Sequence, residues 1–269
     1  MTSKFLSALD SAMEQKGSML CVGLDPATPE MRRDACVPQE YLSHPEGEAE
    51  GLLQFCKGII GQTSQYACAF KTNLQYILPF SLGQMQELNG EVHKAGVQNI
   101  LDVKLSDIGA TNRASIHWAA KAGFDAITAS PFTGNVEETA KYGRELGVGI
   151  IVLTLTSNPE AHFFMRDAQI GGLRGYEWIA GKVAQSGADG CVVGATGTTR
   201  EEWMEIRKTI GEERVILVPG MGAQGGDGKA AVELGGKIIV NSSRETIYSP
   251  EPGKEAKRIR DTLNGLKKK

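Results

Sequence analysis

The sequence predicts an α/β fold, a single (β/α)8 barrel domain of the TIM-barrel type spanning residues 1–269. Eight short apolar runs recur along the chain, and mostly amphipathic stretches separate them. Alternating strands and helices predict βαβ units and a parallel sheet, and eight such repeats in 269 residues are typical of a closed barrel. An open Rossmann-type sheet is the alternative, but no G-x-G-x-x-G follows the first apolar run.

The elements follow one another in a regular order. The predicted strands cover residues 19–24, 67–71, 99–103, 126–129, 149–153, 190–193, 215–218 and 237–240. The helices expected between them cover about 52–66, 82–95, 112–122, 136–146, 176–186 and 200–210. Two connections are unusually long, a predicted surface excursion at about 26–50 and a predicted long loop at about 154–174. Long loops in a compact domain are commonly lids or binding loops.

The composition argues against several kinds of binding partner and indicates a cellular compartment. A net charge of −3, from 29 basic and 32 acidic residues, argues against a nucleic-acid partner. The five cysteines form no C-x-x-C pair, and Cys21, Cys68 and Cys191 lie in apolar runs, which predicts free thiols and a cytoplasmic location. The chain shows no signal peptide and no apolar run near 18 residues, so no membrane partner is expected. The four histidines lack ligand spacing, so no metal site is expected.

The segment 98–112, QNILDVKLSDIGATN, carries a charge cluster at the end of an apolar strand. Strand side chains alternate between faces, so Asp102 and Lys104 are expected to point the same way, with Asp107 shortly after them. Such charges are costly to desolvate unless they pair with each other or serve a ligand. The segment is therefore the first candidate for an active site.

The other strand ends supply further candidates, since barrel enzymes bind ligands at the carboxyl ends of their strands. Polar or turn-forming residues at these ends are Asp25, Lys71, Asn73, Ser130, Thr196, Pro219, Ser243 and Arg244. Asp25, Lys71, Asp102, Lys104 and Asp107 together predict an array in which each lysine contacts a carboxylate and all remain ionised. A purely structural network is the alternative, although buried ion pairs contribute little to stability.

The last two strand ends predict a phosphate site. A glycine-rich segment, PGMGAQGG at 219–226, follows strand seven, and Arg244 follows strand eight. Glycines let backbone N–H groups approach an anion, Gln224 can donate a hydrogen bond, and Arg244 can grip phosphate oxygens in a fork. A glycine-rich turn beside a surface arginine is the alternative.

Four motifs together resemble the orotidine 5′-phosphate decarboxylase family. They are VGLD at 22–25, FKTN at 70–73, DVKLSDI at 102–108 and PGMGAQGGD at 219–227. They occur in this order along the predicted barrel. SPF at 130–132 and VGAT at 193–196 are similar to the longer bacterial branch of that family.

The resemblance implies a lyase that needs no cofactor and converts orotidine 5′-monophosphate to uridine 5′-monophosphate (UMP), the last step of pyrimidine biosynthesis. It implies that Lys104 protonates C6 of the pyrimidine as CO₂ leaves, and that Asp102 lies beside the substrate carboxylate. It further implies that Lys71 pairs with Asp102 and reaches the ribose hydroxyls, where Asp25 also binds.

The same resemblance implies a homodimer with shared active sites, in which Asp107 and Thr111 enter the neighbouring subunit's site. Gln224 and Arg244 would hold the phosphate. The chain departs from the commoner family pattern in two places: Thr196 is the nearest hydroxyl for the pyrimidine, and Ser243 stands where glycine is more usual. The candidate substrate-binding residues are Asp25, Asn73, Thr111, Ser130, Thr196, Pro219, Gln224, Ser243 and Arg244.

Two alternative functions stay open. One is the sister enzyme, a Mg²⁺-dependent decarboxylase of a 3-keto hexulose phosphate, whose metal would need carboxylate ligands. Two lysines, Lys71 and Lys104, fit poorly beside a cation. The other is a non-catalytic barrel that binds a phosphate-bearing ligand.

Overall fold

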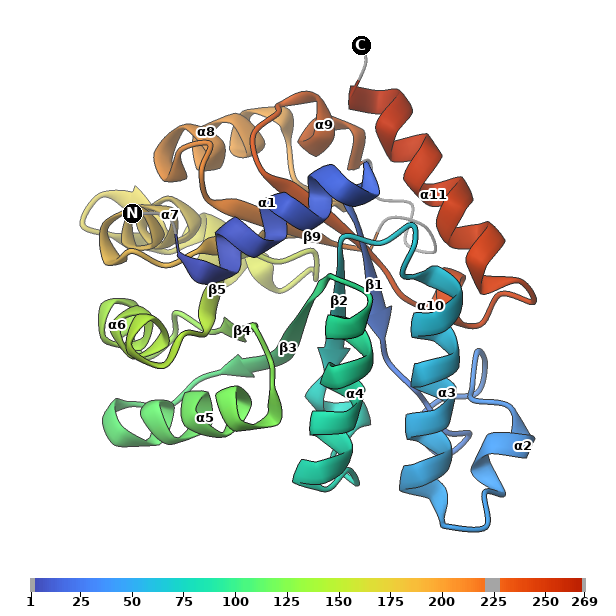
Figure 1. Cartoon of the computed structure of the whole chain (residues 1–269). Helices are drawn as coiled ribbons and strands as arrows, with labels where there is room; N and C mark the ends of the chain where they lie inside the picture. Colours follow the sequence, from blue (N-terminus) through green and yellow to red (C-terminus); the bar gives the residue numbers. More distant parts are fainter. Residues whose placement is uncertain (1–2, 221–227, 268–269) are drawn as a thin grey trace.

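Eight parallel strands form a closed barrel in the computed structural model, which describes residues 3–220 and 228–267 (Figure 1). Their order around the barrel is β1-β10-β9-β8-β5-β4-β3-β2. Each barrel strand therefore lies beside the barrel strand that follows it in the sequence, and β10 closes the barrel against β1. The predicted (β/α)8 architecture is confirmed. The barrel strands are β1 (Leu20–Leu24), β2 (Ala69–Asn73), β3 (Gln98–Leu105), β4 (Ala126–Ala129), β5 (Gly149–Leu155), β8 (Gly190–Val193), β9 (Val215–Pro219) and β10 (Ile238–Ser242).

Helices surround the barrel and cover the outer face of its strands (Figure 1). They are α3 (Glu48–Thr63), α4 (Leu82–Lys94), α5 (Gly109–Ala122), α6 (Val136–Leu146), α7 (Gly175–Ser186), α8 (Arg200–Ile210), α9 (Gly228–Glu233) and α11 (Pro252–Lys267). Shorter helical pieces are α2 (Gln39–Leu42), η1 (Leu74–Tyr76) and α10 (Arg244–Ile247). The strands are buried almost throughout, because one face meets the barrel interior and the other meets the helices.

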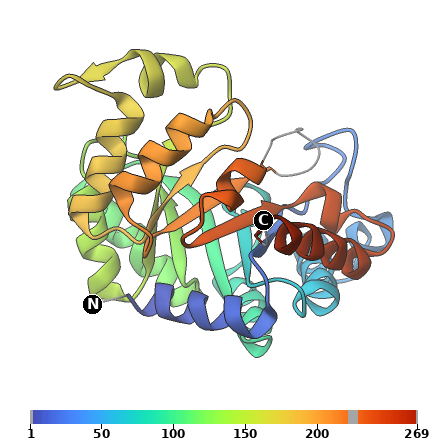
Figure 2. The same cartoon turned by 90° about the horizontal axis from the view of Figure 1, so that it is seen from above.

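Helix α1 (Lys4–Lys16) covers the amino-terminal end of the barrel (Figure 2). Ser3 begins the helix by accepting a hydrogen bond from the N–H of Leu6 at 3.2 Å, and Gly17 ends it in the left-handed conformation at φ 53°. The ring of Phe5 fits against Gly149 at the start of β5, where a Cβ would lie 2.6 Å from Phe5 Cδ1. A small residue at the start of β5 therefore lets α1 seat against the barrel.

Several strands extend further than the apolar pattern predicted. β2 continues to Asn73, β3 to Leu105, β5 to Leu155 and β10 to Ser242, while helix α3 begins four residues before the predicted start, at Glu48. Backbone pairing continues at these strand ends although polar side chains have replaced apolar ones. Because of these extensions, side chains such as Lys104 and Asn241 project from hydrogen-bonded strands and not from loops, which restricts their positions.

The connection predicted as a long loop at about 154–174 contains short elements of regular structure. It contains a π-helical turn, η2 (His162–Asp167), and a two-stranded hairpin of β6 (Gln169–Ile170) and β7 (Leu173–Arg174). Gly171 and Gly172 form the hairpin turn with φ of 60° and 83°, which glycine adopts readily. The predicted excursion at about 26–50 contains α2 and the first turn of α3.

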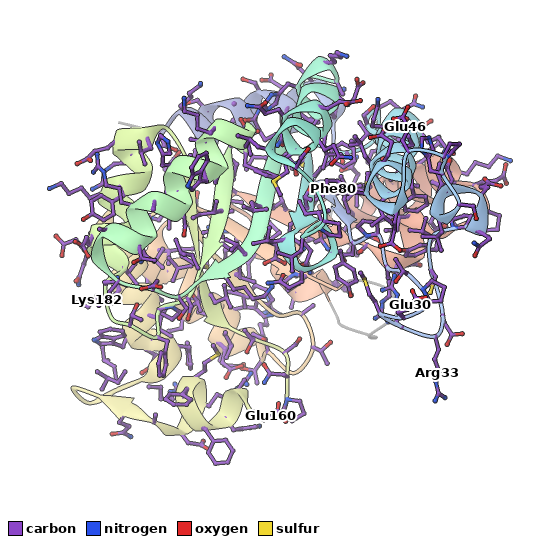
Figure 3. All side chains as sticks on the ribbon, turned by 90° about the horizontal axis from the view of Figure 1, so that it is seen from below. Glu30, Arg33, Glu46, Phe80, Glu160 and Lys182 are labelled. Atoms are coloured by element: carbon purple, nitrogen blue, oxygen red, sulfur yellow. The ribbon has the colours of Figure 1, made fainter. Side chains whose placement is uncertain are left out.

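The η2 connection and the first part of the excursion lie at the end of the barrel opposite α1 (Figure 2). In Figure 3, the labelled Glu160 of the η2 connection and the labelled Glu30 and Arg33 of the excursion lie on this same side. The carboxyl ends of the strands open there, so both connections border the rim where barrel enzymes place their chemistry.

An ion pair holds the η2 connection against α8. Arg166 donates from Nε and Nη2 to the two carboxylate oxygens of Glu202, at 2.7 and 3.2 Å, and from Nη2 to the carbonyl of Gly197 at 2.9 Å. Both side chains are mostly buried, and such two-point contacts fix orientation well. The contact ties the rim segments after β5 and β8 together.

The five cysteines are free, as predicted, and all but Cys36 are buried. Within residues 3–220 and 228–267, no helix combines the length and apolar character needed to cross a membrane.

Candidate active site

Two lysines grip one carboxylate at the carboxyl-terminal rim. Lys71 Nζ lies 2.8 Å from Asp102 Oδ2, and Lys104 Nζ lies 2.7 Å from Asp102 Oδ1. Strands β2 and β3 are neighbours, with Asn73 opposite Asp102, which brings the three charges together. The predicted contact of each lysine with a carboxylate is confirmed, and in both cases the carboxylate is Asp102.

Burial differs sharply within this cluster. The side chains of Lys71 and Asp102 are 7% and 10% exposed, whereas that of Lys104 is 49% exposed. Burial alone would raise the pKa of Asp102, but the ammonium groups of Lys71 and Lys104 hold it well below its usual value. Burial alone would lower the pKa of Lys71, but Asp102 and Asp25 outweigh it and raise that pKa. The pair is therefore ionised at neutral pH.

A bulge in β3 shapes this cluster. Leu101 pairs with Ile127 and Leu105 with Ala129, so three residues of β3 lie opposite the single residue Thr128 of β4. Lys104 adopts φ 51°, a left-handed conformation that is uncommon for residues other than glycine. Asp102 and Lys104 do lie together, as predicted, but the bulge directs them there rather than plain strand alternation.

A cavity of about 270 Å³ adjoins the cluster at the ends of β1, β2, β9 and β10. Its lining residues are Asp25, Lys71, Ser157, Pro219, Gly220, Asn241, Ser242, Ser243, Arg244 and Glu245. Five of these were predicted as site residues. Lys71 joins the two parts of the site, because it lines the cavity and also binds Asp102.

Two buried oxygens of the cavity lining have no hydrogen-bond donor among the residues that the structure describes. They are Asp25 Oδ1 and Asn241 Oδ1; the other oxygen of Asp25 accepts from the Ser243 hydroxyl at 2.5 Å. Buried acceptors are normally satisfied, so a ligand that brings hydroxyl or N–H groups would complete them. Asn241 was not predicted as a site residue; its position inside β10 and against the cavity is seen only in the structure.

Arg244 stands at the mouth of the cavity without an acidic partner among the residues that the structure describes. Its neighbour Glu245 pairs instead with Arg258, at 2.8 Å. An exposed, unpaired guanidinium beside a polar cavity suits an anionic group. Gln224, the other predicted phosphate ligand, lies outside the described residues.

Asp107 and Thr111 do not join the cluster within their own chain. Both are exposed, and Asp107 makes no ion pair in the described part of the chain. Its carboxylate accepts from the N–H of Ile108 at 2.7 Å, and its carbonyl accepts from Asn135 Nδ2 at 2.9 Å. The backbone of this segment is therefore held in place while the Asp107 side chain faces outward.

The remaining predicted residues border the rim at other points. Asn73 ends β2, where its side chain caps η1 by accepting from the N–H of Gln75 at 3.2 Å. Ser130 lines a separate, mostly apolar cavity of about 380 Å³ with Phe132 and Phe164. Thr196 lies in the connection after β8.

Ser157 is a cavity residue that the sequence analysis missed. It follows the extended end of β5 and packs so tightly against the end of β8 that a Cβ on Gly194 would lie 2.7 Å from its backbone nitrogen. The Thr-Ser-Asn run at 156–158 was the available signal, but the predicted strand stopped at residue 153.

Comparisons with known proteins agree with this arrangement. The model of the "Orotidine 5'-phosphate decarboxylase / HUMPS family" matches residues 18–259. Orotidine 5′-phosphate decarboxylases of Azoarcus sp. (strain BH72) and Variovorax paradoxus (strain S110) are each 34% identical; the matches cover 91% and 98% of this chain and 90% and 99% of the relatives.

Solved structures give the same result. The OMP decarboxylase of Leishmania donovani is 26% identical with a TM-score of 0.79, and the match covers 100% of both chains. The UMP synthase of Leishmania donovani is 28% identical with a TM-score of 0.79, over 99% of this chain and 57% of that one. Since the family match spans most of the barrel and the two bacterial relatives exceed 30% identity over nearly the whole chain, this protein belongs to the orotidine 5′-phosphate decarboxylase / HUMPS family.

Proposed function

We propose that this chain catalyses the decarboxylation of orotidine 5′-monophosphate to UMP, the last step of pyrimidine biosynthesis, with no cofactor. The observation that carries the proposal is Asp102 with both oxygens held by lysines, next to a cavity with an unpaired arginine at its mouth. Relatives of this chain bear the corresponding name. The free thiols support a cytoplasmic location.

The cavity fits the polar parts of the nucleotide. In this proposal Arg244 and Ser243 hold the phosphate, and the unsatisfied oxygens of Asp25 and Asn241 accept hydrogen bonds from ribose hydroxyls or the base. The reacting end of the pyrimidine then points toward Lys104 and Asp102. Binding energy from the remote phosphate offsets an unfavourable placement of the substrate carboxylate near Asp102.

Lys104 performs the chemical step. The bond between C6 and the carboxylate breaks, CO₂ leaves, and the electron pair stays on C6 as a carbanion that the ring π system does not delocalise. The Lys104 ammonium stabilises this charge and then transfers its proton to C6. Because the Lys104 side chain is 49% exposed, the amine regains a proton from solvent.

The Mg²⁺-dependent sister activity fits the site less well. The oxygens of Asp102 already accept from Lys71, Lys104 and the Thr128 hydroxyl, at 2.7–2.9 Å, so they are poorly placed for a cation. Within residues 3–220 and 228–267, no group of three or more His, Cys, Asp or Glu side chains could hold a metal ion. These observations favour the metal-free reaction within a family that contains both.

Purified protein should convert orotidine 5′-monophosphate to UMP with full activity in excess EDTA. Loss of pyrimidine absorbance measures the rate, and chromatography identifies the product. Turnover that EDTA abolishes and Mg²⁺ restores, with a 3-keto hexulose phosphate as the better substrate, would favour the sister enzyme. Tight UMP binding without any turnover would indicate a binding barrel.

We also propose a homodimer in which Asp107 and Thr111 complete the partner's site. The support is the outward-facing Asp107 on a held backbone and the neighbouring Ile108, whose side chain is 63% exposed. In such a dimer the partner chain would remove the exposed Ile108 side chain from water.

Mixing two inactive variants should restore activity in such a dimer. Lys104→Ala removes a group that a subunit gives to its own site, and Asp107→Ala removes a group that it gives to its partner's site. Random exchange at equal concentration makes half of the dimers mixed, and each mixed dimer has one intact site and one doubly damaged site. After subunits exchange at equal concentration, activity should rise to about a quarter of the wild-type value for a two-fold symmetric pair. Two copies of the same variant serve as the control, and no gain on mixing would contradict shared sites.

A further inference from the structure

We propose that Thr128 is a positioning residue for the decarboxylation and that its single hydroxyl fixes the Lys104 ammonium relative to Asp102. The inference rests on the proposed function. Thr128 lies on β4, is 1% exposed, and is the one residue opposite the three-residue bulge of β3. It does not line the cavity, so its effect would be exerted through Lys104 and Asp102.

The hydroxyl makes two hydrogen bonds whose directions are fixed. Thr128 Oγ1 accepts from the backbone N–H of Lys104 at 2.9 Å, so its only hydrogen is free to point at Asp102 Oδ1, also at 2.9 Å. The same oxygen of Asp102 accepts from Lys104 Nζ at 2.7 Å. The backbone of Lys104, the Thr128 hydroxyl, the Asp102 carboxylate and the Lys104 ammonium thus form a closed ring of contacts.

The bulge explains why this hydroxyl is needed. Because three residues of β3 face one residue of β4, β4 cannot offer a backbone acceptor to each N–H of the bulge. The side-chain hydroxyl of Thr128 serves as the acceptor for the N–H of Lys104. Lys104 sits at φ 51°, which side chains other than glycine rarely adopt without support from their surroundings. Without the hydroxyl, the backbone N–H of Lys104 loses its acceptor, and the bulge is held to β4 only by the backbone pairs on either side of it.

The consequence falls on the chemical step rather than on binding. The Lys104 ammonium must meet the reacting carbon, and a displacement of about 1 Å in such a group costs roughly a hundredfold in rate. Thr128 is not part of the cavity lining that contains Asp25 and Arg244, so binding of the nucleotide should be retained. Loss of the Thr128 hydroxyl should therefore lower kcat and leave KM nearly unchanged.

Three variants test this assignment. Thr128→Val keeps the shape and removes the hydroxyl, and Thr128→Ser keeps the hydroxyl and removes the methyl group. Thr63→Val is the matched control, because Thr63 is also fully buried and donates one hydrogen bond, to the Ile59 carbonyl at 2.7 Å, on the outer helix α3. Kinetics with orotidine 5′-monophosphate, calorimetric affinity for UMP and thermal unfolding are measured for each.

Thr128→Val should lower kcat by about tenfold to a hundredfold while KM and UMP affinity change by less than about twofold. Thr128→Ser should recover most of the lost rate, and Thr63→Val should leave kcat unchanged even if it lowers the melting temperature. If the valine variant does not fold, Thr128→Ala carries the same expectation.

Three results would overturn the assignment. They are a Thr128→Val kcat within twofold of wild type, a serine variant as slow as the valine variant, and a loss that appears in KM. An inactive wild-type chain would overturn the proposed function as well, whereas an active wild type with an unimpaired Thr128→Val would overturn only the role of Thr128.

Discussion

Lys104→Ala should lower kcat by about four orders of magnitude or more, because it removes both the charge that stabilises the carbanion and the proton that C6 receives. UMP affinity should fall far less, since the phosphate and ribose groups of the cavity are untouched. The assay is loss of pyrimidine absorbance at saturating substrate, with product identified by chromatography. A variant that keeps more than a hundredth of wild-type turnover would contradict the role of Lys104.

Stability should hardly change in this variant. The Lys104 side chain is 49% exposed, and its loss leaves Asp102 paired with Lys71, so unfolding free energy should shift by about 1 kcal/mol or less. Alanine at φ 51° is no more strained than lysine, since both carry a Cβ. Lys94→Ala is the matched control: it removes an exposed lysine paired with Glu91 at 2.8 Å on α4, and it should keep full activity.

Asp102→Asn should abolish turnover and also destabilise the fold. It leaves the Lys71 ammonium, 7% exposed, without its direct counter-charge, and breaking a buried ion pair in this way costs about 3 kcal/mol or more. Catalysis fails because Lys104 loses the carboxylate that orients it. Urea unfolding at neutral pH and the decarboxylation assay measure the two effects separately.

The stability difference between wild type and Asp102→Asn should depend on pH. The pKa of Asp102 is depressed in the folded state, so its stabilisation is present above the ordinary aspartate pKa of 3.8 and is lost as the pH falls through the folded-state value. The pKa of Lys71 is raised, so its share persists until the pH exceeds 10.5. The difference should therefore be largest near neutral pH and shrink in acid.

The double variant Lys71→Met/Asp102→Asn separates charge from packing. Removing both charges should restore part of the stability that Asp102→Asn loses, because no ammonium is left buried alone. Activity should stay absent, since the carboxylate is still missing. A double variant less stable than Asp102→Asn by the full cost of both substitutions would show that the two charges do not act as a pair.

The barrel could be predicted because eight apolar runs carry the information locally. Each run needs only its own residues to identify a buried strand, and Asp102, Lys104 and Lys71 stand out because charges at the end of such a run are costly. The rim was harder. Asn241 lies within β10 and Ser157 follows the extended end of β5, and the apolar pattern alone does not show that either residue faces the cavity.

The bulge could not be predicted, because it exists only in the pairing of β3 with β4. Nothing in the residues around Lys104 indicates that three of them would face Thr128 alone. The structured η2 connection was missed for a similar reason: its anchor is the contact of Arg166 with Glu202, 36 positions later in the chain. Features that depend on contacts between distant parts of the chain are seen only in the three-dimensional structure.

Helix α1 seats its Phe5 against Gly149 at the end of the barrel away from the chemistry. Substitutions under that helix should therefore change the thermal stability of the protein with little effect on the site at the opposite end of the barrel. Because the α1 contact and the candidate active site lie at opposite ends of the barrel, the contact is also a suitable place to engineer higher thermal stability without loss of turnover.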